Sequence, residues 1–249
     1  YKIDNLCLAG GVALNCVANG KILKEKIFKN IWIQPAAGDA GGSLGGALQY
    51  WYHELGNKRH VKNDQIDEMK GSYLGPEYSN NEIKKQLEEC GAIFEELNDK
   101  ELIDHTAKSL SIGEAVGWFQ GRMEFGPRAL GGRSILGDPR SETMQKNLNL
   151  KVKYRESFRP FAPSVLAEDV SNWFDLNLES PYMLIVSDVK KEKIIEMNED
   201  QKKLFGINKL NIKRSEIPAV THVDYSARIQ TVHKNTNSRY FELLTKFKE

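Results

Sequence analysis

Two apolar runs that end in small residues, each followed by a helix pattern, constrain the fold most strongly. The run "NLCLAGG" begins at Asn5 and leads into the helix pattern "VALNCVANGKILKEKI". The run "NIWIQPA" begins at Asn30, is stopped by Pro35 and leads through glycines into "AGDAGGSLGGALQYWYHELG". Strand and helix in alternation, with a turn of small residues at each strand exit, are typical of an α/β domain. The same pattern predicts that Cys7 and Cys16 lie in the core.

Composition places the chain among soluble globular proteins. Its 249 residues carry a net charge of +1, which disfavours a broad surface for nucleic acid or membrane. Three cysteines without a CxxC pair indicate a reducing compartment, taken here as the cytoplasm, and no structural zinc. A polar linker over 58–70 predicts two domains, 1–57 and 71–249. Because the chain opens without an initiator methionine, we expect it to be a fragment of a longer protein.

The second predicted domain continues the α/β (α+β) pattern. Ser79 and Glu82 form a capping box, and Asp99 is expected to cap the next helix. Strands are expected in "EAVGWFQG", "RPFAPSVLA", "YMLIVSDV" and "VTHVDYSARIQTV", and helices in "SETMQKNLNL" and "SRYFELLTKFKE". The segment 190–216 lacks periodicity and is expected to be a mobile surface excursion.

The stretch "GWFQGRMEFGPRALGGRSILGDPR" places four arginines among glycines. Arginine presents a planar fork of donors that matches phosphate oxygens, and glycine lets several forks converge. A solvated basic face is the ordinary explanation of a charge run, but here the cations alternate with apolar residues, which favours a lined cleft. From Arg122 to Arg159 nine cations stand against four acids. The cations are Arg122, Arg128, Arg133, Arg140, Lys146, Lys151, Lys153, Arg155 and Arg159.

Lys153 and Arg155 form a Lys-x-Arg pair that would point to one face at strand spacing. Two adjacent cations repel each other unless an anion lies between them, and a nucleotide triphosphate or carbamoyl phosphate would serve. Glu156 could instead neutralise the pair as an ordinary surface contact. The neighbouring apolar run "FRPFAPSVL" favours the functional interpretation.

The glycine turns of the first domain are candidate ligand contacts. Gly10 and Gly11 precede a helix, where N–H groups attract anions, and Asn15 could reach a ribose or base. Five glycines between Gly38 and Gly46 would each cost a helix roughly 1 kcal/mol relative to alanine. Close packing or a ligand at the backbone must offset that cost. Asp39 could bind a metal or could simply cap the helix.

These motifs resemble the O-carbamoyltransferase family, which includes nodulation-factor, tobramycin and cephamycin carbamoyltransferases. "LAGGVALN" and "PAAGDAGGSLGGAL" look like the end of its actin-like ATPase domain. "GRMEFGPRALGGRSIL.DPR", "N.KVKYRESFRPFAPSVL" and "VTHVDYSARIQTV" look like its YrdC-like C-terminal domain. In such domains a Lys-x-Arg pair holds nucleotide phosphates, which Lys153 and Arg155 match, whereas a second Ser-x-Asn pair is not found. The family's metal-binding histidine pair and its "NTSFN"-type segment also do not occur, and Tyr225 stands where we expect glycine.

The resemblance implies that carbamoyl phosphate and ATP form carbamoyl-adenylate, with Mg²⁺, and that the carbamoyl group passes to a hydroxyl of a small acceptor. It implies a divalent metal, Fe²⁺, in the actin-like domain with Asp39 as one ligand, no nucleic-acid or membrane partner, and room for a homodimer. A buried His222–Asp224 hydrogen bond could merely shape the site. The expected catalytic residues are Lys153, Arg155, Arg128 and Arg133. The expected substrate and nucleotide contacts are Gly10, Gly11, Asn15, Gly38, Gly41, Gly42, Arg122, Arg159, His222, Asp224 and Arg228.

Three other functions share parts of this pattern. A threonylcarbamoyl-type tRNA-modifying enzyme shares both domain folds, but its tRNA requires a broad basic surface. A small-molecule kinase on the actin-like scaffold leaves the Lys-x-Arg domain unexplained. A regulatory nucleotide-binding module would bind ATP without transferring any group.

Overall fold

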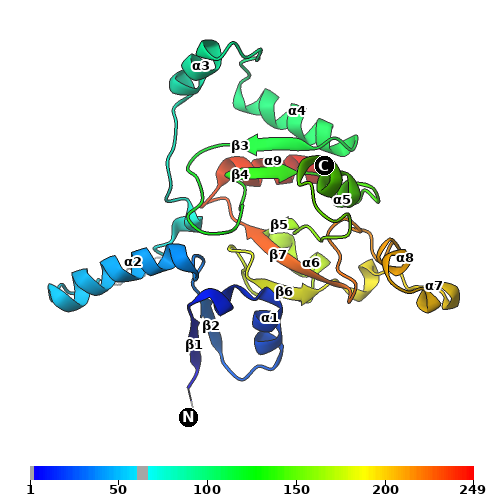
Figure 1. The fold of residues 1–249 in the computed structure, drawn as a ribbon, viewed down its shortest axis with the longest axis horizontal. Helices are drawn as coiled ribbons and strands as arrows, with labels where there is room; N and C mark the ends of the chain where they lie inside the picture. Colours follow the sequence, from blue (N-terminus) through cyan, green and yellow to red (C-terminus); the bar gives the residue numbers. More distant parts are fainter. Residues whose placement is uncertain (1–2, 61–66) are drawn as a thin grey trace.

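The computed structural model describes residues 3–60 and 67–249. As the sequence predicts, the chain is a mixed α/β protein, and its described residues form three small sheets, β1-β2, β3-β4 and β5-β7-β6 (Figure 1). The strands are β1 (Asn5–Leu8), β2 (Asn30–Ile33), β3 (Val116–Phe119), β4 (Arg133–Leu136), β5 (Ser164–Leu166), β6 (Ile185–Asp188) and β7 (Ser226–Val232). The α-helices are α1 (Cys16–Lys24), α2 (Asp39–Gln49), α3 (Asn80–Glu89), α4 (Asp99–Ser111), α5 (Met144–Asn147), α6 (Val170–Trp173), α7 (Glu199–Lys203), α8 (Ile207–Leu210) and α9 (Ser238–Lys248). Short 3₁₀ turns are η1 (Gly11–Leu14), η3 (Lys70–Ser72), η5 (Ala167–Asp169) and η6 (Lys191–Lys193), and π-helical turns are η2 (Tyr50–Glu54) and η4 (Leu148–Val152).

The first segment has the predicted order of strand, helix, strand, helix. Strands β1 and β2 pair in parallel, with Leu8 opposite Ile33 at the end of the ladder. The predicted first helix is divided into η1 and α1 because Asn15 interrupts it. The Asn15 side chain accepts a hydrogen bond from the Ala18 N–H at 3.1 Å and so caps α1.

The glycines of α2 differ in their surroundings. A Cβ atom at Gly41 would collide with the carbonyl oxygen of Ala36, so this glycine is required by close packing. Gly42, Gly45 and Gly46 face open space. Helix α2 continues into η2 and projects from the body of the molecule (Figure 1). Packing therefore explains one of these glycines, and the helix tolerates the others without a contact.

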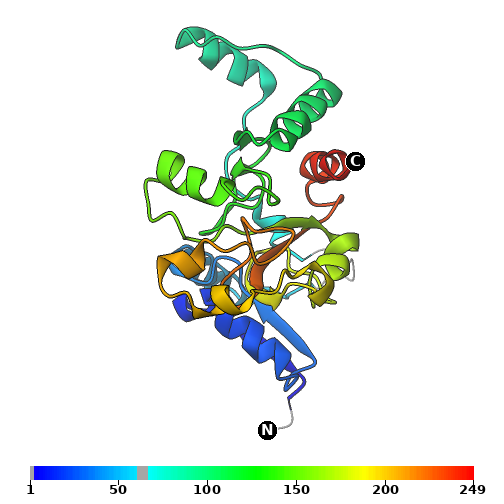
Figure 2. The same cartoon turned by 90° about the vertical axis from the view of Figure 1, so that its right-hand side faces the viewer.

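Helices α3 and α4 begin at capping boxes. The Ser79–Glu82 box is confirmed, but the predicted cap at Asp99 is wrong. Asn98 is the cap: its side chain accepts from the Glu101 N–H at 3.0 Å, and Asp99 is the first helical residue. Helix α4 packs along α9, whereas α3 stands away from the rest of the molecule in both views (Figure 2). In the described part of the chain no helix is long and apolar enough to cross a bilayer.

Two sheets form the second segment. Strands β3 and β4 are antiparallel, with Trp118 opposite Ser134. Strand β4 was not predicted, because its residues follow an arginine- and glycine-rich stretch that resembles a loop. Strand β7 is central in the other sheet, parallel to β5 and antiparallel to β6, with Arg228 opposite Val186. Arg228 therefore lies on the central strand, with β5 on one side and β6 on the other.

The two segments share one hydrophobic core. Ala13 and Ile33 of the first segment pack in one cluster with Phe174 and Ile229 of the second. Helix α1 lies on β6 (Figure 1). A Cβ atom at Gly20 would collide with a backbone oxygen of β6, so glycine allows this approach. The boundary over 58–70 stays a prediction, and residues 61–66 lie outside the described residues.

Two sequence predictions about burial are wrong. Cys7 is exposed, because β1 belongs to a two-stranded sheet that is open to solvent in the described part of the chain. Cys16, the first residue of α1, is only half-buried. The excursion 190–216 is anchored rather than loose. Arg214 and Ser215 are buried, and a β-bridge joins Ser215 to Ile194. Most of its other residues are exposed, which accounts for the lack of hydrophobic periodicity.

Candidate active site

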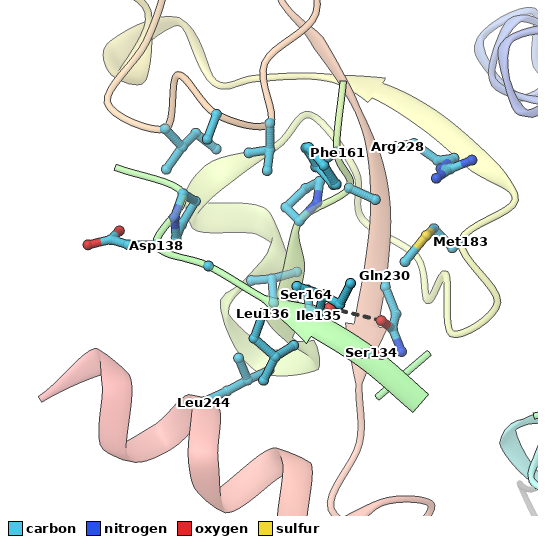
Figure 3. Close-up of a pocket in the computed structure, with 18 of the residues that line it drawn as sticks. Ser134, Ile135, Leu136, Asp138, Phe161, Ser164, Met183, Arg228, Gln230 and Leu244 are labelled. Carbon is cyan, nitrogen blue, oxygen red and sulfur yellow. Dashed lines mark hydrogen bonds between the residues drawn. The ribbon is translucent and has the colours of Figure 1, made fainter. Parts of the chain in front are cut away.

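A cavity of about 610 Å³ lies between the β5-β7-β6 sheet, β4, α5 and α9 (Figure 3). One side is polar and includes Arg228 and Gln230 of β7, which share a face because they are two residues apart. Gln230 accepts a hydrogen bond from Ser164 of β5 at 2.8 Å. Ile135 and Leu244 belong to the apolar lining. The cavity therefore offers polar and apolar surface to one ligand.

Six cationic side chains line this cavity, and two of them are paired with acids. Arg140 makes a bidentate contact with the buried carboxylate of Asp138, with N–O distances of 2.8–3.1 Å. Lys248 contacts both carboxylate oxygens of Asp169, at 2.9 and 2.7 Å. These pairs fix the wall of the cavity beside α9. The six cations are Arg128, Arg140, Lys153, Arg155, Arg228 and Lys248.

The other four cations form no ion pair with any acid in the described residues. We call Arg128, Lys153, Arg155 and Arg228 the cation quartet. They come from three separate segments: the glycine-rich loop, the Lys-x-Arg segment and β7. Lys153 is exposed, but the three arginines are half-buried, and uncompensated positive charge in a partly enclosed site is costly unless an anion binds there. The quartet is therefore a candidate anion site.

Burial and the neighbouring positive charges of the cation quartet both affect the pKa of Arg228. Burial lowers the pKa of its guanidinium, and the positive charges of Arg128 and Arg155 lower it further, against an opposing contribution from Cys16. An arginine remains charged in spite of such a shift. Electrostatic repulsion therefore acts among these three side chains and would be relieved by bound phosphate oxygens.

Arg128 also reaches the first segment. Its guanidinium donates to the Leu14 carbonyl oxygen at 3.2 Å, and its buried Nε has no hydrogen-bond partner in the described part of the chain. A Cβ atom at Gly126 would lie 3.4 Å from Pro35 O and the Ala36 Cβ, so the arginine-bearing loop packs on the exit of β2. Arg128 and its loop thus lie against the first segment at Leu14 and at the exit of β2.

Glu124 organises the arginine-bearing loop, a role that the sequence analysis missed. Its buried carboxylate accepts N–H bonds from Leu130 and Gly132, both at 2.7 Å, and from Arg133 at 3.2 Å. One carboxylate thus accepts the backbone N–H groups that would bind a neighbouring strand if the loop were part of a sheet. The signal available in the sequence was a lone acid inside a cation-rich glycine loop.

Lys153 and Arg155 both line the cavity. The predicted strand spacing is wrong, because the two residues do not lie on a strand. The segment leaves the π-helical turn η4 at Lys153, and Tyr154 has a positive φ of 48°. Arg155 then lies over the ring of Phe161, with its Cζ atom 5.0 Å from the ring centre. A left-handed residue between the two cations, rather than strand alternation, directs both side chains toward the cavity.

Three other predicted arginines do not line the cavity. Arg133 donates to the carbonyl oxygens of Gln120, Gly121 and Gly132 and stacks on Phe119 at 3.5 Å, so its guanidinium is used to hold the loop. The other two are exposed and lie near acids, Arg122 at 3.5 Å from Glu77 and Arg159 at 2.8 Å from Glu156. Only some cations of the basic stretch therefore line the cavity, because nearby carbonyl oxygens or acids bind these three arginines.

His222 and Asp224 form a turn beside the sheet rather than part of the cavity lining. The direct hydrogen bond expected between them is absent, and Ser226 bridges the two side chains instead. The Ser226 Oγ donates to Asp224 Oδ1 at 2.6 Å and lies 3.1 Å from His222 Nδ1. Because the hydroxyl proton is used by the carboxylate, Nδ1 is the donor to Ser226. Tyr225 has a φ of 63°, which is the physical reason to expect glycine there.

The pKa of His222 predicts how acid affects this turn. Burial lowers this pKa, Asp224 opposes that effect, and Arg228 and Arg214 lower the pKa further. The unfolded chain therefore binds the proton more readily, and stability should fall as pH drops below the ordinary histidine pKa of 6.5. We expect His222→Gln to reduce the loss of thermal stability between pH 7.5 and 5.5.

Thermal unfolding of the wild type and the variant at both pH values measures this effect. His105→Gln is the control, because that histidine is exposed on α4. An equal loss of stability in wild type and His222→Gln would contradict the assignment.

The glycine contacts predicted in the first segment lie on exposed or half-buried backbone. Gly10 and Gly11 are exposed, and Gly10 has a φ of 93° that requires glycine. Asn15 is occupied as the cap of α1, so its predicted contact with a ribose or base would compete with that bond. Gly38 is the cap residue of α2, and Gly41 and Gly42 follow in its first turn. None of these positions lines the cavity.

Asp39 does not assemble a metal centre with its neighbours. It is exposed in the first turn of α2, and Gly38, not Asp39, is the cap. Within residues 3–60 and 67–249 no group of three His, Cys, Asp or Glu side chains could hold a metal ion. The described residues therefore do not fit a complete site for Fe²⁺ or Mg²⁺, and we assign no chemical step to a metal.

Most of the chain matches one group of known families. The family described as "Carbamoyltransferase C-terminus" matches residues 107–249, which include the whole cation quartet. The chain belongs to the carbamoyltransferase family. The description "Carbamoyltransferase N-terminus" matches residues 1–48, the segment that carries both glycine turns.

Similar proteins cover nearly all of this carbamoyltransferase-family chain. It is 61% identical over 247 residues to "Uncharacterized protein sll1178" of Synechocystis, spanning 98% of this chain and 40% of that protein. It is 41% identical to "Nodulation protein NolNO" of Sinorhizobium fredii and 39% identical to "Nodulation protein NolO" of Bradyrhizobium diazoefficiens. Both similarities span 99% of this chain, and 33% and 41% of those proteins. The chain thus spans well under half the length of these relatives.

Proposed function

We propose that the cavity binds carbamoyl phosphate and ATP, and that the complete protein transfers the carbamoyl group to a hydroxyl of a small-molecule acceptor. The observation that carries this proposal is the cation quartet, four positive side chains on one cavity without acidic partners in the described residues. Family membership supports carbamoyl transfer as the type of reaction. The cytoplasm is the proposed location.

Charge explains why such a reaction needs this cavity. Both substrates are polyanions, so they repel each other in the geometry that reaction requires. Arg128, Arg155 and Arg228 present planar forks to phosphate oxygens, while Lys153 supplies a mobile point charge. Cations that are already in place stabilise both the encounter and the charge that develops on the leaving group.

The proposed formation of carbamoyl-adenylate has two parts. Carbamoyl phosphate and one water give carbamate and inorganic phosphate, with cleavage of a bond between oxygen and the carbamoyl carbon or phosphorus. An oxygen of carbamate then attacks the α-phosphorus of ATP, and the bond to the bridging oxygen of pyrophosphate breaks. The products are carbamoyl-adenylate and pyrophosphate, and the electron pair of the broken bond leaves on pyrophosphate.

Cavity size and lining fit a nucleotide better than carbamoyl phosphate alone. About 610 Å³ is within the range of cavities that enclose drug-sized ligands. The apolar lining from β4, α5 and α9 suits an adenine ring. Two relatives are named nodulation proteins, so we propose an acceptor of the nodulation-factor, sugar or antibiotic kind.

Pyrophosphate release measured with the complete protein tests the proposal. We expect release from ATP to depend on carbamoyl phosphate and to continue to product when a hydroxyl acceptor is present. Release that requires L-threonine and bicarbonate would instead identify a threonylcarbamoyl-type enzyme. Formation of ADP would identify a kinase, and tight ATP binding without turnover would identify a regulatory module. Any of these three results would overturn the proposal.

A further inference from the structure

The motif that carries Lys153 and Arg155 also contains Asn149, a fully buried amide at 0% exposure. It is the second residue of η4. Its Nδ2 donates to the Ser157 carbonyl at 3.0 Å and to the Arg159 carbonyl at 2.8 Å. Both amide protons are thereby used to close the segment that follows η4. Asn149 is therefore the anchor of the loop that reaches the cavity.

The remaining polar atoms of Asn149 bind Arg155. Its backbone oxygen accepts from the Arg155 N–H at 3.0 Å, and its Oδ1 accepts from Arg155 Nε at 2.6 Å. Arg155 is therefore held by one residue at both its backbone and its side chain. The terminal amino groups of Arg155 make no hydrogen bond in the part of the chain that the structure describes, and they remain available to a ligand.

An amide orients an arginine without cancelling its charge. Elsewhere in this chain carboxylates hold arginines: Asp138 binds Arg140 and Glu156 binds Arg159. Those partners neutralise the cation, whereas Asn149 leaves Arg155 with its full positive charge. A carboxylate at position 149 would also place an oxygen against the Ser157 and Arg159 carbonyls, where an N–H donor is required.

We propose that Asn149 is the positioning residue for Arg155: it aims the guanidinium at the anion in the cavity and keeps it uncompensated. This inference rests on the proposed function, because it takes the cation quartet as the phosphate site. It assigns no contact between Asn149 and substrate. It explains why a fully buried polar side chain lies directly beside the Lys-x-Arg pair.

Calorimetric titration of the complete protein with inorganic pyrophosphate tests the inference. We expect Asn149→Asp to weaken binding at least about tenfold, since the new carboxylate neutralises Arg155 and loses both carbonyl contacts. Asn147→Asp is the matched control, with the same change of charge at an exposed position two residues away. It should bind within about twofold of the wild type, as expected for a surface charge.

A double-mutant cycle separates positioning from a general structural role. In the Arg155→Ala background, Asn149→Asp should cause little further loss of binding, because the side chain through which it acts is gone. A structural role alone predicts the same loss in both backgrounds. Thermal unfolding of each variant confirms that folded protein is titrated, and Asn149→Ser replaces Asn149→Asp in the cycle if the aspartate variant does not fold.

Two results would overturn the inference in different ways. If Arg155→Ala weakens pyrophosphate binding but Asn149→Asp does not, or if their effects add fully, Asn149 does not position Arg155 and the proposed function stands. If Arg155→Ala binds pyrophosphate as tightly as the wild type, the cation quartet is not the phosphate site. The assignment of the cavity then fails together with the inference.

Discussion

Lys153→Ala and Arg155→Ala are each expected to abolish carbamoyl-phosphate-dependent pyrophosphate release by the complete protein. Both side chains line the cavity and neither has an acidic partner in the described residues, so each contributes a positive charge there that no carboxylate neutralises. Loss of one such charge contact in the proposed anion site should lower kcat/KM roughly 10³-fold. Initial rates of pyrophosphate formation under saturating ATP measure the effect.

Two further variants make this experiment specific. Arg155→Lys keeps the charge but loses the planar fork and the Nε contact with Asn149, so an intermediate rate is expected. Lys146→Ala removes an exposed cation of the same basic stretch that does not line the cavity, and it should leave the rate unchanged. Wild-type rates in both Lys153→Ala and Arg155→Ala would remove these residues from the site.

Gly20→Ala is expected to destabilise the protein by roughly 3 kcal/mol, as overpacking against rigid backbone does. The added Cβ would collide with the Val186 carbonyl oxygen in β6, which cannot move without disturbing the sheet. Displacing α1 would also strain the buried Asn19 amide, which donates to Ala13 O at 2.8 Å and to Leu184 O at 3.0 Å. Denaturant unfolding of the purified variant measures the loss.

Gly45→Ala is the matched control for that variant. Gly45 also lies inside a helix, but a Cβ atom there would meet open space. Alanine has the higher helix propensity, so this variant should gain about 0.5–1 kcal/mol. Equal stability changes in the two variants would show that helix propensity, and not the contact with β6, governs Gly20.

The basic stretch shows how far a pattern of residue types can predict a site. Of the four arginines among glycines, Arg128 and Arg140 line the cavity, where Lys153 and Arg155 of the Lys-x-Arg pair and Arg228 of β7 join them. The pattern could not distinguish them from Arg133, whose guanidinium is occupied by loop carbonyls. That difference depends on which acceptors lie within reach after folding, and these come from distant parts of the chain.

Buried polar residues were harder to assign than exposed or charged ones. Asn149 has no distinguishing sequence pattern, and Glu124 stands out only as a lone acid in a cation-rich loop. Each nevertheless makes three or more hydrogen bonds that hold the arginine-bearing segments. The predicted cap at Asp99 failed for a related reason: Asn98 and Asp99 can both cap a helix, and the choice depends on backbone angles. Side-chain chemistry alone therefore could not decide which of the two residues caps α4.

By itself the sequence determined what depends on neighbours along the chain. It determined the α/β class, the strand-turn-helix order of the first segment, the Ser79–Glu82 capping box and the amphipathic α9, because periodicity and caps act within a few residues. Only the tertiary structure decided that both segments share one core and which cations remain without acidic partners. Those outcomes depend on contacts between residues far apart in the chain, such as Asn19 and Leu184, which are 165 positions apart and which no local pattern connects.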